Sequence, residues 1–456
     1  MATTRWRSIA FGVASAAATT LIGGPLQSGS RFAAVAAERP ATSAVGDVAR
    51  ESEDQPTGDI ALRDVLALAL ARSPELAAFG WRVRAADAGV VQAGLLPNPS
   101  LDASTQDVGV PSRLEGQAEF TLELGQLIEL GGKRAARIEQ ASRGRELAAW
   151  DYEVARIDVL ARASQAFVTV LVAQQQLDLA EENVQLAQNV VDAVATRVRA
   201  GSTPTAELTK AEVARASARV ERDGVRRALD VARRQLAATW GSTEARFRRA
   251  RGDLERITPL PSFASVAARL DRSPDLGRWT TELLERRAAI DLEKSRTVPD
   301  VTARGGYRRL FDPGVNTFVV GLSVPLPIFD RNQGAIAAAE SRLSQAREDA
   351  NAARVRLSAA LGDAYQSVAT AGEQIATLRS DVIPGAREAF ATLNAGYRAG
   401  RFSYLEVLDA QRTLIGARVQ YVRALGDYHR SLTAVERLLG EPLQRDDPSA
   451  PAAGEE

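Results

Sequence analysis

The stretch Arg72-Ser73-Pro74-Glu75-Leu76 decides the fold, because it returns as Arg272-Ser273-Pro274-Asp275-Leu276. Other short motifs recur at nearly the same offset: Arg199-Ala200-Gly201, for example, returns as Arg398-Ala399-Gly400. A chain that repeats itself with so little drift uses one supersecondary plan twice. We therefore expect an internal two-fold repeat, with the first copy at 59–241 and the second at 242–440.

The sequence outside the two copies has the composition of targeting and disordered segments. Residues 1–37 resemble a secretory signal peptide, because Arg5 and Arg7 precede an apolar run and Ala34-x-Ala36-Ala37 is a suitable cleavage site. We expect 38–58 and 441–456 to be a disordered linker and tail, since both are rich in Pro, Ser and acidic residues. No further run is long and apolar enough to suggest a helical membrane anchor.

Overall composition excludes several classes of function. Lys plus Arg and Asp plus Glu both total 57, so no net field attracts nucleic acid. The sequence has no cysteine, which excludes disulfides, thiolate metal sites and a lipidated cysteine. It also has no phosphate-binding loop, nucleophile elbow or His-containing triad, so we expect no catalytic residues, no bound metal and no cofactor.

Each copy contains a long helical hairpin. Residues 133–200 lack proline and are rich in Ala, Leu, Arg, Glu and Gln, which predicts a helix about 100 Å long. We expect Gly201 to end this helix, and Thr203 and Pro204 to serve as N-cap and first residue of a second arm that runs to about 240. Taken alone, this segment is also compatible with an ordinary coiled coil.

The hairpin of the second copy turns at Gly400, where Ser403 and Glu406 have the spacing of a capping box at the start of the last arm. Pro384-Gly385 should kink or break the helix before it. The repeat predicts that the two hairpin tips lie at the same end of the molecule.

Before each long helix the apolar period falls from 3.6 to 2, which predicts strands. In the first copy we expect strands at about 100–106 and 118–124, joined by a turn at 108–111. In the second copy we expect strands at about 301–308 and 317–324, joined by a turn at 311–314. The alternating apolar positions of the later strand in each pair are Ala118, Phe120, Leu122, Leu124, Phe318, Val320, Leu322 and Val324. Such strands suit a transmembrane barrel, although soluble hairpins packed on a helix would give the same pattern.

Four strands cannot close a barrel, and an open sheet edge in lipid leaves backbone groups without partners. If these strands enter a membrane, the protein must oligomerise.

At this point the sequence resembles the outer-membrane efflux proteins of the TolC family over about residues 60–440. The motifs that carry the resemblance are Pro97-Asn98-Pro99, Leu130-Gly131-Gly132-Lys133-Arg134, Pro325-Leu326-Pro327-Ile328-Phe329-Asp330-Arg331-Asn332-Gln333-Gly334 and Tyr397-Arg398-Ala399-Gly400. The residues of the second and third motifs are most similar to those of the branch that serves heavy-metal pumps of the cobalt-zinc-cadmium type.

The resemblance implies an α+β membrane protein in which three subunits combine four strands each into a twelve-stranded transmembrane β-barrel above a tunnel of long helical hairpins. It implies a homotrimer in the lipid of the cell outer membrane, with the tunnel reaching into the periplasm. The implied partners are a periplasmic adaptor protein and an inner-membrane pump of the resistance-nodulation-division type. The implied function is a passive exit duct for heavy-metal cations, and not an enzyme.

The resemblance also assigns roles to individual residues. It places the acidic periplasmic aperture at Glu406 and Asp409, where Glu406 has a second, capping role. It places adaptor docking on the hairpin tips, at Arg199, Gly201, Thr203, Arg398, Gly400 and Ser403, although a glycine there is equally a helix-ending residue. It places strand-to-helix turns at Gly131, Gly132, Lys133, Arg134, Asp330, Asn332, Gln333 and Gly334.

Two alternatives stay open. The same duct could export drugs or take part in type I protein secretion, because barrel and tunnel would look alike. In a different class, the chain could be a periplasmic coiled-coil scaffold or the adaptor itself, but an adaptor should have one helical hairpin and not two.

Overall fold

The computed structural model describes residues 56–106, 118–311 and 314–443. The predicted signal peptide, the linker up to residue 55, the strand turn at 108–111, residues 312–313 of the second turn and the tail from 444 onward lie outside these ranges. Residues 441–443, which we assigned to the disordered tail, pack on the chain: Leu443 is buried and its N–H donates to Glu436 Oε1 over 3.0 Å.

The elements occur in the same order twice. The first copy contains β1 (Asp59–Ala61), α2 (Leu62–Arg72), α3 (Pro74–Ala93), β2 (Ser100–Gln106), β3 (Glu119–Ile128), α4 (Lys133–Arg199) and α5 (Thr205–Ala238). The second contains β4 (Arg249–Arg251), α6 (Phe263–Ala267), the 3₁₀-helix η1 (Leu270–Arg272), α7 (Pro274–Ser295), β5 (Val301–Leu310), β6 (Asn316–Ser323), α8 (Gln333–Thr377), the π-helix η2 (Leu378–Val382), α9 (Ile383–Arg398) and α10 (Tyr404–Leu439).

The repeated Arg-Ser-Pro motif begins a helix in each copy. The hydroxyls of Ser73 and Ser273 accept from the N–H groups of Leu76 and Leu276, both over 3.4 Å, and proline follows at the first helical turn. The glycines that end each copy pack on these prolines. A Cβ on Gly241 would lie 3.0 Å from Pro74, and one on Gly440 would overlap Pro274. In each copy, therefore, the glycine at the end packs against the proline near the start.

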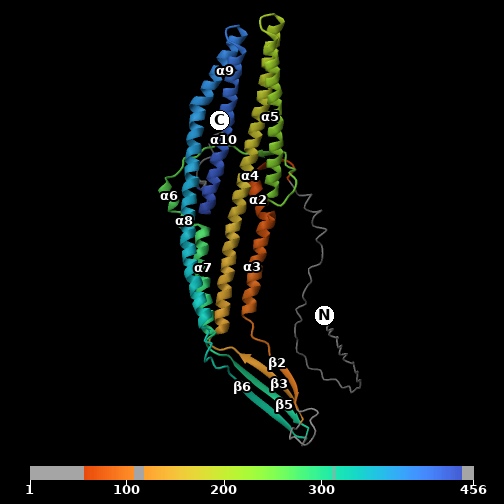
Figure 1. Ribbon diagram of the computed structural model, residues 1–456, viewed down its shortest axis with the longest axis vertical. Coiled ribbons are helices and arrows are strands. Elements are labelled where there is room, and N and C mark those ends of the chain that lie inside the picture. Colours follow the sequence, from red (N-terminus) through yellow and green to blue (C-terminus); the bar gives the residue numbers. More distant parts are fainter. Residues whose placement is uncertain (1–55, 107–117, 312–313, 444–456) are drawn as a thin grey trace, which may run out of the picture. The chain divides into compact units, whose positions relative to one another are not determined.

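The two helical hairpins lie side by side, and both tips lie at the end away from the sheet (Figure 1). α4 packs against α3, α5, α7 and α10, while α8 packs against α7 and α10. The predicted interruption at Pro384 is present as the π-helix η2 followed by a new helix with proline in its first turn.

The predicted start of the second arm is wrong in detail. Pro204, and not Thr203, is the N-cap of α5, and no side chain caps this helix. The Thr203 hydroxyl instead accepts from Arg197 Nε over 3.1 Å. The capping box at Ser403 and Glu406 is confirmed.

The sheet order is β2-β3-β5-β6, with every neighbouring pair antiparallel. The strands of the two copies meet at β3 and β5, where Leu124 is opposite Gly305. β2 and β6 are the edges. The sheet does not pack against the sides of the helices. Its strands lie beyond the helix ends, on the side opposite the hairpin tips (Figure 1).

A second, parallel pair of strands joins the starts of the two copies, which sequence reasoning missed. Ile60 of β1 is opposite Ala250 of β4. Buried Gln174 of α4 donates to the Ala250 carbonyl over 3.0 Å and accepts from the Ala250 N–H over 2.9 Å. This pair lies against the main hydrophobic core, which α2, α4, α5, α8 and α10 share.

Among the described residues, α4 contains an 18-residue window apolar enough to suggest a membrane span. More than half of that window, 56%, is buried inside the chain, as in the core helix of a packed bundle.

Candidate functional site

One face of the sheet is apolar and uncovered. The register places alternate residues of all strands on this face, and its middle is formed by Leu101, Ala103, Phe120, Leu122, Leu124, Ala303, Gly305, Tyr307, Phe318, Val320 and Leu322. Toward its ends the same face carries the polar residues Thr105, Gln126, Arg309 and Asn316. Phe318 is 89% exposed and Val320 is 85% exposed. A water-facing sheet of this size would hide such side chains, so this face needs an apolar environment.

The opposite face is polar and carries charges of both signs. Asp102 is opposite Glu123, and Glu119 lies 3.5 Å from Arg308, which also donates to Thr121 Oγ1 over 3.2 Å. Apolar side chains therefore predominate on one face and polar side chains on the other, as they do in a barrel that encloses water.

The first predicted strand-to-helix turn holds sheet and helices together. Gly131 and Gly132 have φ of +69° and +74°, and a Cβ on Gly131 would lie 2.6 Å from Val298. Lys133 Nζ lies 2.6 Å from Asp300, and Arg134 Nε donates to the Gly94 carbonyl over 2.7 Å. Both copies thus contribute to this turn.

The second turn uses the same backbone conformation with a different residue. Asn332, the N-cap of α8, has φ of +59°, as Gly132 does before α4. Its amide donates to the Glu293 carbonyl over 2.8 Å and to Glu293 Oε2 over 2.7 Å. Asp330 accepts from the Asn332 N–H, Gln333 accepts from the Arg331 N–H, and Gly334 lies in the first turn of α8. These residues form a structural joint.

We expect Asn332→Ala to destabilise each subunit by about 2–3 kcal/mol, because alanine resists the left-handed conformation and makes neither amide hydrogen bond. Asn332→Gly should cost about 1 kcal/mol, since only the hydrogen bonds are lost. Thermal unfolding of the detergent-solubilised protein, followed by far-UV circular dichroism, measures both variants. Equal losses would show that the backbone conformation contributes nothing.

The two hairpin tips contact each other directly, which sequence reasoning did not predict. Arg197 donates from Nη1 to the Tyr397 carbonyl, and its guanidinium lies 4.6 Å from the centre of the Tyr397 ring. Tyr397 and Tyr404 belong to a small hydrophobic cluster, separate from the main core, that includes Val194 of α4. The predicted tip glycines, Gly201 and Gly400, have φ of +69° and +76°.

The remaining predicted tip residues have local roles. Arg199 donates from Nη2 to Thr196 Oγ1 over 3.2 Å within its own helix. Arg398 lies in the last turn of α9, and Ser403 caps α10. Each tip is therefore a short turn between two helices, and its residues Arg199, Gly201, Arg398 and Gly400 are exposed.

The predicted aperture residues lie one helical turn apart on α10. Tyr404, Val407 and Gln411 form the buried face, whereas Glu406 and Asp409 are exposed. Glu406 Oε2 accepts from the Ser403 N–H over 2.7 Å and from its hydroxyl over 2.8 Å. These donors lower the pKa of Glu406. The Asp409 carboxylate makes no hydrogen bond or ion pair with the residues that the structure describes.

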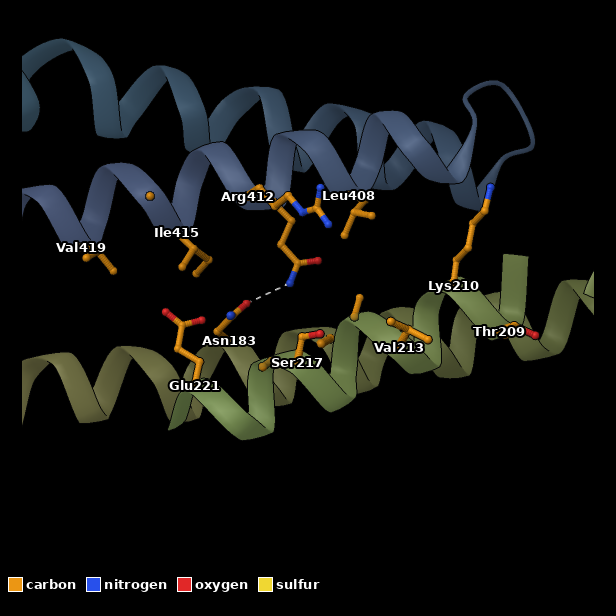
Figure 2. Close-up of a pocket in the computed structure, with 15 residues that line it drawn as sticks. Asn183, Thr209, Lys210, Val213, Ser217, Glu221, Leu408, Arg412, Ile415 and Val419 are labelled. Atoms are coloured by element: carbon orange, nitrogen blue, oxygen red, sulfur yellow. Dashed lines mark hydrogen bonds between the residues drawn. The ribbon is translucent and has the colours of Figure 1, made fainter. Parts of the chain in front are cut away.

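A cavity of about 610 Å³ lies between the hairpins behind the tips. Figure 2 shows Lys210, Val213 and Glu221 of α5 facing Arg412 and Ile415 of α10. At its floor Gln411 donates to Asn183 Oδ1 over 3.0 Å. The hairpins touch at the tips and along α4, and between these contacts they leave a mixed polar and apolar groove.

Comparison with known proteins finds a matching family and several relatives of this chain. The model of the family described as outer membrane efflux protein matches residues 65–242 and 266–441, which lie within the two copies apart from the last matched residue. The cobalt-zinc-cadmium resistance protein CzcC of Cupriavidus metallidurans is 35% identical over 407 residues, or 89% of this chain and 95% of that protein. The nickel-cobalt-cadmium resistance protein NccC of Alcaligenes xylosoxydans xylosoxydans is 30% identical, over 64% of this chain and 68% of that protein.

Solved structures share the fold at low sequence identity. CusC, a transmembrane channel, aligns with a TM-score of 0.71 at 19% identity, covering 83% of this chain and 92% of that one. The outer membrane protein VceC of Vibrio cholerae aligns with a TM-score of 0.69 at 20% identity, covering 84% and 97%.

Proposed function

Because the chain belongs to the outer membrane efflux protein family, we propose that it forms the trimeric exit duct of a tripartite efflux system for heavy-metal cations. In this proposal an inner-membrane pump and a periplasmic adaptor hand the cations over, and the duct passes them without a cofactor. Its outer-membrane location and its likeness to metal-resistance efflux proteins follow from the comparisons.

The observation that carries the proposal is the two-faced sheet with two free edges. The apolar face matches the lipid, and the polar face suits a water-filled lumen. In the part of the chain that the structure describes, this strand order leaves the outer side of β2 and of β6 without a partner strand, and lipid would penalise each unpaired backbone group by several kcal/mol. Three copies that pair edge to edge would remove every edge.

The metal cargo is supported by the names of the relatives and by the charge of the aperture. CzcC and NccC are named for resistance to cobalt, zinc, nickel and cadmium. A deletion strain tested against these cations and against a panel of drugs separates the metal duct from the drug duct. Sensitivity to drugs alone would overturn the metal assignment and leave the duct intact.

The adaptor is proposed to dock on the hairpin tips. The support is geometric: Arg197 and Tyr397 hold the two tips side by side, so a partner meets both turns at once. Glycine at each turn leaves the backbone open to close approach.

Replacing both Glu406 and Asp409 by alanine should change the conductance of the purified protein in planar bilayers. A ring of six carboxylates from three subunits concentrates cations and binds multivalent ions at the constriction. We expect block by multivalent cations to weaken by about tenfold or more, which corresponds to about 1.4 kcal/mol of lost binding energy. Asp381→Ala, on the exposed helix interruption, is the matched control. Unchanged block in the double variant would remove the aperture assignment.

The selectivity for cations should also depend on pH in a defined direction. Because the pKa of Glu406 is lowered, its charge persists on acidification past the ordinary value of 4.5 and is lost only as the pH falls through the lowered pKa. Ser403→Ala removes the hydroxyl donor, so selectivity should be lost at a higher pH than in the wild type. Reversal potentials across a salt gradient at decreasing pH measure this shift. Identical titrations would contradict the role of Ser403.

A further inference from the structure

A cluster of exposed arginines lies outside both helical hairpins, in and directly before β4. Its members are Arg246, Arg248, Arg249 and Arg251. The proposed duct gives this cluster no role, because the sheet, the tips and the aperture are all formed by other residues. The segment that follows Gly440, at the end of the second copy, contains one arginine and five acidic residues in 441–456. The internal repeat therefore does not require the cluster, which we call the arginine rim.

Two buried residues between the arginines hold the rim in place. Phe247 and Ala250 are both buried. Gln174 of α4 makes hydrogen bonds with both backbone groups of Ala250. Arg233 of α5 donates to the Phe247 carbonyl, and its guanidinium lies 5.2 Å from the centre of the Phe247 ring. The rim is thus fixed to two long helices, while its own arginine side chains remain exposed.

The carboxylate that neutralises part of the rim lies beneath it. Asp59 of β1 accepts from Arg248 over 2.9 Å and from Arg251 over 2.6 Å. The Asp59 side chain is 11% exposed, whereas the side chains of Arg248 and Arg251 are 76% and 72% exposed. One carboxylate is therefore shared by two guanidiniums that cover it. A molecule that approaches from outside meets the positive charge first.

The helix before the rim adds to the positive charge. Residues 222–251 contain nine arginines and three acidic residues, although the whole chain has equal numbers of basic and acidic residues. Asp178 and Glu181 of α4 each pair with one of these arginines over 3.2 Å. Even when these two residues and Asp59 are counted, the region keeps an excess of three positive charges in each subunit.

The rim faces the periplasm in the proposed duct. β1, β4 and α2 belong to neither hairpin and form an added layer against α4. On the lumen side such a layer would obstruct the passage, so the duct requires it on the outside. The 20 residues of α3 extend about 30 Å from this layer toward the sheet. Lipid head groups extend only about 5–8 Å beyond the hydrocarbon, so they do not reach the rim.

We infer that the arginine rim binds peptidoglycan, the glycan–peptide polymer of the cell wall, through the carboxylates of its peptides. The inference rests on the proposed duct and adds to it a contact with the wall that the duct must cross. Guanidinium groups suit this partner because they bind carboxylates through two parallel hydrogen bonds and are weakly hydrated. Since salt screens exposed ion pairs, the contact should be reversible.

Co-sedimentation with purified peptidoglycan sacculi tests this contact. The detergent-solubilised full-length protein should sediment with sacculi at low ionic strength and be released as salt is raised toward about 1 M. Sacculi whose carboxylates have been amidated should bind little protein. R248Q/R249Q should weaken binding by about tenfold or more, because three subunits together lose six cations. In this variant Asp59 keeps Arg251 as its partner.

A matched control removes the same charge from another part of the chain. Arg162 and Arg354 also form ion pairs and are about half exposed, so R162Q/R354Q should bind sacculi as the wild type does. R246Q/R249Q retains both partners of Asp59 and replaces R248Q/R249Q if that variant does not form trimers. Vesicles of phosphatidylglycerol serve as the lipid probe, and their binding should not differ between the wild type and the rim variants.

Each outcome has one meaning. Equal binding by the rim variant and the control, or undiminished binding to amidated sacculi, overturns the inference. Binding to vesicles that depends on the rim, without binding to sacculi, assigns the rim to lipid and overturns it too. A trimeric wild type that does not sediment with sacculi overturns the inference and leaves the duct standing. A wild-type protein that is monomeric in detergent overturns the proposed duct itself.

Discussion

Val320→Arg is expected to remove the protein from the outer membrane. Val320 lies near the middle of β6, on the apolar face, and is 85% exposed. An arginine at the midplane of a barrel costs about 2–4 kcal/mol, so three subunits together lose about 6–12 kcal/mol. We expect less than a tenth of the wild-type trimer in the outer-membrane fraction and a loss of metal resistance.

Val319→Arg is the matched control, because the neighbouring residue lies on the opposite face, beside Gly306. An arginine there faces the lumen in the proposed barrel and should leave the trimer in place. If both variants insert equally well, the apolar face does not contact lipid. If neither variant inserts, this part of β6 tolerates no large side chain. Val320→Leu is then the variant that distinguishes the two faces.

The repeat allowed much of the fold to be predicted from the sequence. The recurrence of Ser73-Pro74 as Ser273-Pro274 predicted two copies of one plan, and in the structure each Ser-Pro pair begins a helix. The change from period 3.6 to period 2 located the strands, since strand faces depend on neighbouring residues alone.

Contacts between distant residues could not be predicted in this way. Arg197 and Tyr397 meet at the tips, and although Tyr397 begins one of the recognised motifs, nothing near either residue in the sequence indicates this contact. The strand pair of β1 and β4 was missed because three residues are too few to show a period. In the structure it is held by buried Gln174 and by Asp59, which accepts from Arg248 and Arg251.

The error at Thr203 has a physical cause. Thr-Pro normally predicts an N-cap followed by the first helical residue, but Arg197 at the end of the preceding helix takes the Thr203 hydroxyl as its acceptor. The competing hydrogen bond crosses the turn, so the capping rule, which considers only the new helix, does not detect it.

Arg437→Ala should be the most destabilising single truncation among the charged residues of the helices. Arg437 of α10 donates to Asp158 of α4 over 2.6 Å and to Asp275 of α7 over 3.0 Å, in a partly buried cluster where the two copies meet. Removing the arginine leaves two carboxylates without their cation, which costs about 3–5 kcal/mol when such a pair is buried. Denaturant unfolding in detergent measures this loss.

The pH dependence distinguishes lost charge pairing from lost packing. Burial already raises the pKa of Asp275 above its usual value, and Arg437 opposes this rise. Without Arg437 the folded protein should bind a proton at Asp275 that the unfolded chain releases near its ordinary pKa. The deficit of the variant should therefore shrink on acidification and grow as the pH rises toward neutral. Arg162→Ala, in a pair with Glu75 that is about half exposed, should cost less than about 1 kcal/mol and show no such trend. A deficit in Arg437→Ala that stays constant with pH would assign the effect to packing of the side chain.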